Sequence, residues 1–93
     1  MTYDILPYTY KQAKRLDVTV YPSTNRKYKL DIYDSNGDFV TSVGAAGYSD
    51  FPHYIESHGM EYAEKRRALY KKRHSRDRAV IGSRGYWADR LLW

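Results

Sequence analysis

Apolar and polar residues alternate with a period of two in the first half of the chain. In the segment 27–33, Tyr28, Leu30 and Ile32 alternate with charged residues, which is the pattern of a half-buried strand. A shorter alternation over 16–20 predicts a strand before it. The pattern therefore predicts two neighbouring strands, separated by a turn.

A hairpin turn and a returning strand follow. The turn sequence over 34–37 is Asp-Ser-Asn-Gly, and Asn-Gly tolerates the positive φ angles of a tight hairpin. The segment 39–43 is the predicted returning strand, with Phe39, Thr41 and Val43 expected on one face. Three short consecutive strands with tight turns predict an antiparallel meander.

The second half of the chain has the signals of helices. Asp50 is a capping carboxylate and Pro52 lies in the first turn, where its missing N–H is harmless, so a helix is expected to start here. Gly59 interrupts this helix, and a second helix is predicted over 60–74. A last short helix is predicted over 86–92.

These elements predict an α+β fold, a small antiparallel β-meander of three strands followed by two to three short helices. A chain of 93 residues has the length of one domain. Residues 1–15 show no clean period and are predicted to form an extended N-terminal arm. Residues 16–93 are predicted to form a single α+β domain with a C-terminal aromatic tail.

Composition narrows the class of protein. The chain has no cysteine, which excludes disulfide bonds and thiolate metal sites and fits a reducing compartment. No apolar run approaches the ~18–20 residues of a membrane helix, so we expect no membrane span. Tyrosine occurs 11 times, against 2 Phe and 2 Trp. These rings either line boundaries with a partner and water or fill a core that is short of aliphatic residues.

Charge is segregated along the chain. Residues 34–64 carry six acidic side chains and no Lys or Arg, whereas residues 65–93 carry ten basic and two acidic ones. Steps of 100° along the helix predict that an apolar stripe packs against the fold; its members are Tyr62, Ala63, Leu69 and Tyr70. The basic side chains outside this stripe either form a solvated face or bind phosphates or an acidic protein surface. These predicted partner-binding cations are Lys65, Arg67, Lys71, Lys72, Arg76 and Arg78.

Two arginines fall inside the apolar stripe. Arg66 and Arg73 are seven residues apart and project between the aromatic positions. One interpretation is buried ion pairing with the acidic middle segment, for example with Asp50 or Glu56. The others are that each guanidinium stacks on aromatic rings, or that it holds a phosphate or a partner carboxylate with two hydrogen bonds.

No pattern typical of catalysis is present. His53 and His58 are five residues apart, which does not place them on one helical face, and no cysteine or carboxylate pair completes a metal site. The acidic turn over 34–38 lacks the terminal glutamate of a calcium loop. We therefore expect no enzyme activity, cofactor, metal or small-molecule substrate.

Several stretches of the chain resemble a known family when taken in order. They are Gly44–Asp50 (GAAGYSD), Arg66–His74 (RRALYKKRH) and Gly82–Trp93 (GSRGYWADRLLW), preceded by the hairpin over 33–37. Their order and spacing resemble a family of small proteins of unknown function from large DNA viruses of protists and algae and from some aquatic phages. The resemblance implies a viral origin and supplies no catalytic residues.

The viral resemblance leads to a hypothesis about function. The protein is predicted to be a minor virion component of the capsid-associated, cement or scaffold type, found in the virion and, during assembly, in the host cytoplasm or nucleus. It would dock on larger acidic protein surfaces, such as capsid proteins, with Tyr86, Trp87 and Trp93 as aromatic anchors. The alternative is a nucleic-acid-binding accessory protein that places the predicted cations on phosphates, and a third option is a regulator that binds an acidic groove of an enzyme or host factor.

Overall fold

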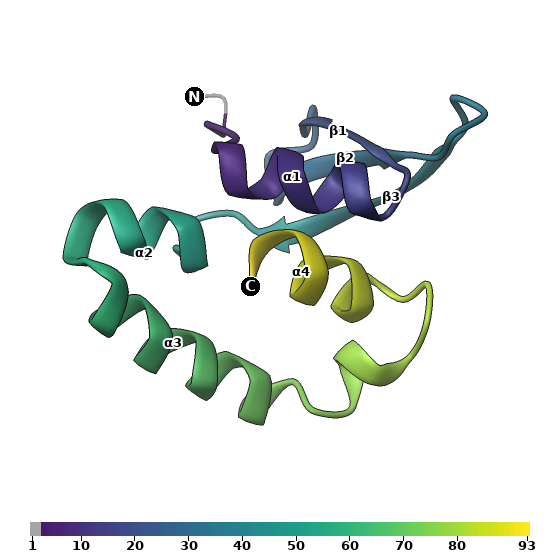
Figure 1. The fold of residues 1–93 in the computed structure, drawn as a ribbon. Coiled ribbons are helices and arrows are strands. Elements are labelled where there is room, and N and C mark those ends of the chain that lie inside the picture. The colour runs from purple at the N-terminus through teal and green to yellow at the C-terminus, as the bar shows by residue number, and fades with distance from the viewer. Residues whose placement is uncertain (1–2) are drawn as a thin grey trace.

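A three-stranded antiparallel sheet and four α-helices make up the fold in the computed structural model, which describes residues 3–93 (Figure 1). The strands lie in the order β1 (Thr19–Pro22), β2 (Tyr28–Tyr33) and β3 (Phe39–Ala45). The helices are α1 (Pro7–Arg15), α2 (Phe51–His58), α3 (Met60–Arg73) and α4 (Arg84–Leu92), with a short 3-10 turn, η1 (Asp77–Ala79), before α4. The predicted α+β fold and its three-stranded meander are confirmed.

The prediction of an extended N-terminal arm is wrong for most of its length. Residues 7–15 form α1, which begins at Pro7 and buries Thr9 and Ala13, one turn apart, against the rest of the fold. The Thr9 hydroxyl donates to the carbonyl of Leu91 in α4 at 2.9 Å. The helix escaped the sequence prediction because the two residues that it buries, Thr9 and Ala13, are small and not strongly apolar. The first two residues of the predicted arm lie outside the described part of the chain.

The hydrophobic core lies between the sheet and α4. Leu30 and Ile32 of β2 are fully buried, and Val43 of β3 is nearly so. Leu91 and Leu92 of α4 belong to the same apolar cluster and are equally inaccessible. Figure 1 shows α4 between the sheet and α3, with the α2–α3 pair extending away from the strands. The core therefore joins α4 directly to the sheet, and α3 lies on the other side of α4.

A bulge in β3 changes the face on which one aromatic ring lies. Ile32 pairs with Thr41, but the next residue, Tyr33, pairs with Phe39 instead of Val40. The extra residue moves Phe39 to the face opposite Thr41, because a shift of one residue along a strand reverses the face of the side chain. The prediction that Phe39 shares a face with Val43 is therefore wrong, and Phe39 is 56% exposed.

Strand β2 is buried on both faces, not on one as its alternation predicted. Its charged residue Asp31 is only 7% exposed. The carboxylate accepts hydrogen bonds from the hydroxyls of Ser23 and Ser42, each at 2.6 Å, and from the backbone N–H of Thr24 at 3.3 Å. Burial raises the pKa of Asp31, but these hydrogen bonds lower it more, so the net pKa lies below its usual range.

The helical hairpin α2–α3 begins and ends as the sequence predicts. The Asp50 carboxylate accepts from the backbone N–H of His53 and caps α2. Gly59, at φ +88°, separates the two helices. The predicted apolar stripe of α3 is only half correct. Ala63 and Tyr70 are buried, whereas the other two members, Tyr62 and Leu69, are exposed because α3 covers the fold with a narrow face.

We predict that Gly44→Ala destabilises the protein more than Gly37→Ala does. Both glycines have a positive φ, +81° and +83°, so each alanine costs roughly 1–2 kcal/mol of backbone strain. A Cβ at Gly44 would also lie 2.7 Å from Cδ1 of Leu92, whereas one at Gly37 meets nothing within 4 Å. Overpacking adds about 1–3 kcal/mol at Gly44 alone. Urea unfolding of both variants measures the difference, and equal losses of stability would contradict the close contact between β3 and α4.

We also predict a loss of stability in acid that depends on Asp31. Because its pKa is lowered by folding, ionised Asp31 stabilises the folded state above pH ~4, and this contribution is lost as the pH falls through the lowered folded value. Asp31→Asn should reduce stability at pH 7 and flatten the dependence of the unfolding free energy on pH below ~4. Urea titrations between pH 2.5 and 7 test this, and identical slopes in both proteins would refute it.

Candidate functional site

A buried carboxylate joins three parts of the chain near the start of α2. Asp50 is fully inaccessible and accepts a hydrogen bond from the Tyr3 hydroxyl at 2.6 Å. Its Oδ2 lies 3.1 Å from Nζ of Lys29 in β2, and its Oδ1 lies 2.8 Å from Nδ1 of His53. The N-terminal segment, the sheet and α2 thus meet at one side chain.

Burial and the neighbouring charges shift the pKa values of three of the four polar groups in this cluster. Burial raises the pKa of the Tyr3 hydroxyl far above its ordinary value, and its hydrogen bond to Asp50 raises the value further. Burial raises the pKa of Asp50, but the charge of Lys29 and the hydrogen bonds from Tyr3 and His53 lower it more. Burial lowers the pKa of Lys29, which Asp50 partly offsets. The four groups thus form an ion cluster, centred on a buried carboxylate, that joins the N-terminal segment, β2 and α2.

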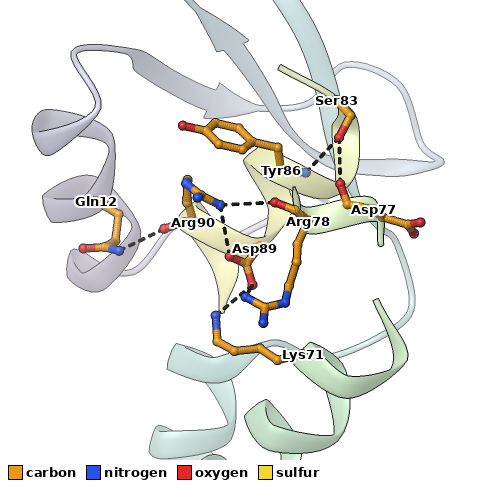
Figure 2. A network of polar contacts seen from close by, with 8 residues as sticks. All are labelled: Gln12, Lys71, Asp77, Arg78, Ser83, Tyr86, Asp89 and Arg90. Atoms are coloured by element: carbon orange, nitrogen blue, oxygen red, sulfur yellow. Dashed lines mark hydrogen bonds and ion pairs between the residues drawn. The ribbon is translucent and has the colours of Figure 1, made fainter. Parts of the chain in front are cut away.

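A second carboxylate, Asp89 of α4, connects α4 to α3 and to the segment before α4 (Figure 2). It is 5% exposed and lies 2.7 Å from Nζ of Lys71, 3.2 Å from Nη1 of Arg90 and 3.9 Å from Nη1 of Arg78. Lys71 and Arg78 are two of the cations that the sequence assigned to a partner. The structure assigns them to the fold, because Asp89 is buried and requires compensating charge.

The remaining predicted cations do not form one free surface either. Lys65 lies 3.8 Å from Glu61, and Arg67 lies 4.0 Å from Glu64 with its guanidinium 3.9 Å from the centre of the Phe51 ring. Within residues 3–93, two members of the predicted set make no ion pair and are exposed: Lys72 and Arg76.

The predicted ion pairing of Arg66 and Arg73 is also wrong. Neither guanidinium has a carboxylate within 4.0 Å in the described part of the chain. Asp50, the proposed partner, is already neutralised by Lys29. Arg66 instead lies over the ring of Tyr54, 5.5 Å from its centre, and its Nε is buried without a hydrogen-bond partner.

The three predicted aromatic anchors contribute to the interior of the molecule. Trp93 stacks on Tyr70 with ring centres 4.4 Å apart and planes 7° apart, so the end of the chain is held against α3. Trp87 packs against the core, and the Arg90 guanidinium lies 3.8 Å from the centre of the Tyr86 ring. These rings stabilise the position of α4 and are only partly buried, so their role as anchors for a partner stays a prediction.

A cavity of about 510 Å³ lies between α3, α4 and the ends of β2 and β3; we call it the basic groove. Three arginines line it, namely Arg66, Arg73 and Arg84. Its aromatic lining consists of Tyr28, Tyr48, Tyr54, Tyr70 and Trp93, and its floor is aliphatic, with Val43 and Leu92. The basic groove thus unites cations and flat rings that are far apart in the sequence.

The electrostatic balance of the basic groove is positive. None of its three arginines lies within 4.0 Å of a carboxylate among residues 3–93. Its one exposed acid, Asp77, faces His74 at 3.1 Å. Arg84 lies over the Tyr28 ring at 5.1 Å, which keeps the guanidinium at the wall of the groove. An anion that entered would meet three guanidinium groups that have no carboxylate partner, and one carboxylate, Asp77.

A second surface lies on the sheet, and we call it the aromatic row. It consists of Tyr21, Tyr33 and Phe39, whose neighbouring ring centres are 5.5 and 5.6 Å apart in edge-to-face contact. Tyr21 is 54% exposed and Phe39 is 56% exposed. Sequence reasoning missed this row because strict alternation placed Phe39 on the face of Thr41 and Val43. The bulge that moves Phe39 to the other face depends on the pairing of β3 with β2.

Comparisons with family models, with curated protein sequences and with solved structures gave no match. The viral resemblance therefore stays a prediction. Among residues 3–93, none of the helices combines the length and the apolar character that crossing a membrane requires.

We predict that Asp50→Asn destabilises the protein strongly and that a second substitution offsets the loss. The asparagine still caps α2 but leaves the buried Lys29 ammonium without its counter-ion, which costs about 3–5 kcal/mol. Adding Lys29→Met removes the unpaired charge, so the double variant should be more stable than Asp50→Asn alone. Urea unfolding of both variants tests this. A double variant less stable than Asp50→Asn would show that the unpaired charge of Lys29 does not cause the loss of stability.

Proposed function

We propose that this protein is a minor structural component of a virion that acts through protein–protein contacts, with the aromatic row as its docking site. The observation that supports the proposal is the exposure of the row: two of its three rings are more than half exposed in a chain of 93 residues. The resemblance to small viral proteins supports the setting.

The aromatic row has the features of a protein-binding surface. Its rings touch one another and form a contiguous apolar strip on a rigid sheet, so little conformational freedom is lost on binding. Tyrosine and phenylalanine are enriched at protein interfaces because they bury a large area. The tyrosine hydroxyls add hydrogen bonds at the edge of such a contact. A larger protein with a shallow apolar depression is the partner that this strip fits.

The chemistry of the partner differs from the sequence-based expectation. An acidic protein surface was predicted from six cations, and only Lys72 and Arg76 among them are exposed without an ion pair in the described chain. A few charges at the rim of an interface mainly steer association and add little affinity. We therefore place the main contribution to docking on the aromatic row.

The proposal predicts a fixed ratio of this protein to the major capsid protein in purified virus particles. Replacing Tyr21 and Phe39 together by serine should reduce incorporation by about tenfold or more, as expected for losing central aromatic contacts of an interface. The measurement is quantitative mass spectrometry of particles from cells that express the tagged variant beside the viral copy.

The control is Ile81→Ser, which alters an 84% exposed apolar side chain outside the row. It should be incorporated like the wild type. Absence of the wild-type protein from particles would overturn the virion role. Normal incorporation of the double-serine variant would overturn the role of the aromatic row.

A further inference from the structure

The basic groove lies beside a second cavity of about 850 Å³, and we call the two together the basic track. The two cavities share the lining residues Tyr28, Lys29, Tyr48 and Ser49, so they adjoin on either side of these side chains. The second cavity adds Arg26 from the turn before β2. The basic track therefore extends from the groove between α3 and α4 to the turn before β2.

Positive charge is distributed along the whole basic track. Arg26 lies in one cavity, Arg84 lies beside Tyr28 at the junction, and Arg66 and Arg73 lie in the other cavity. None of these four arginines has a carboxylate within 4.0 Å among residues 3–93. A row of spaced cations matches a ligand that carries a negative charge at each repeat.

A free aromatic ring stands at the junction of the two cavities. Tyr48 lines both of them, is 75% exposed and makes no ring–ring contact within the described residues. Most of this ring is thus available to a planar group. The guanidinium of Arg66 lines the same groove and lies over the Tyr54 ring, 5.5 Å from its centre.

We infer that the basic track binds single-stranded nucleic acid, with phosphates on Arg66, Arg73 and Arg84 and an unpaired base on Tyr48. Guanidinium groups bind phosphate oxygens with two parallel hydrogen bonds, and a base stacks on an aromatic ring whatever its sequence. A duplex hides the faces of its bases and cannot present them to a ring in a concave track. An acidic peptide would satisfy the arginines but would leave the Tyr48 ring unused.

This inference does not depend on the proposed virion role, because the basic track shares no residue with the aromatic row. It also differs from the predicted nucleic-acid site. That site used Lys71 and Arg78, which the structure ties to Asp89. The phosphate contacts move from the outer face of α3 to the groove between α3 and α4.

Fluorescence anisotropy with a labelled ten-nucleotide oligothymidylate tests the inference on the full chain. With about three phosphate contacts, the logarithm of the association constant should fall with the logarithm of salt concentration with a slope of roughly −2. Arg73→Gln and Arg84→Gln should each reduce the slope by about 0.7. Tyr48→Ala should weaken binding roughly tenfold and leave the slope unchanged.

The matched control is Arg15→Gln, which removes the same charge from an exposed arginine of α1 outside the track. It should leave affinity and slope near those of the wild type. Circular dichroism confirms that each variant is folded. Three results would overturn the inference: equal effects of Arg73→Gln and Arg15→Gln, a duplex bound as tightly as the single strand, or ten-residue polyglutamate bound as tightly as the oligonucleotide.

Discussion

The position of the helical hairpin depends on one buried carboxylate. Asp50 ends the loop after β3, caps α2 and receives hydrogen bonds from Tyr3 and Lys29. Because it is fully inaccessible, its charge is tolerated only while these partners surround it. These contacts fix the direction in which the loop leaves the sheet. That direction sets α2, then α3 after Gly59, and with α3 one wall of the basic groove.

The second buried carboxylate fixes the other end of α3 and also decides which cations stay free. Asp89 forms an ion pair with Lys71 and lies near Arg78. Two cations that the sequence predicts to bind a partner therefore form contacts within the fold. Arg66 and Arg73, for which buried ion pairing was one prediction from the sequence, have no carboxylate within 4.0 Å among the described residues. Contacts between residues far apart in the sequence thus reverse the expected roles of these cations. Lys71 and Arg78 are paired with Asp89, whereas Arg66 and Arg73 line the basic groove.

Local signals predict much of the fold and little of the site. The alternation around Leu30, the cap at Asp50 and the break at Gly59 act over a few residues, and the strands and the α2–α3 hairpin follow from them. Helix α1 does not, because the buried Thr9 finds its partner 82 residues away in α4. The bulge at Val40 and the ion pairs of Asp89 are likewise consequences of tertiary contact, so no window of sequence contains them.

The two candidate surfaces arise from different parts of the fold, which lets a short chain carry both. The aromatic row depends on the pairing of β2 with β3, whereas the basic track depends on where α3 and α4 end. Trp93 stacks on Tyr70 of α3, and both rings line the groove beside α4. A substitution in the row therefore leaves the walls of the track in place. A protein built in this way can contact a larger protein on its sheet while a flexible polyanion lies between its helices.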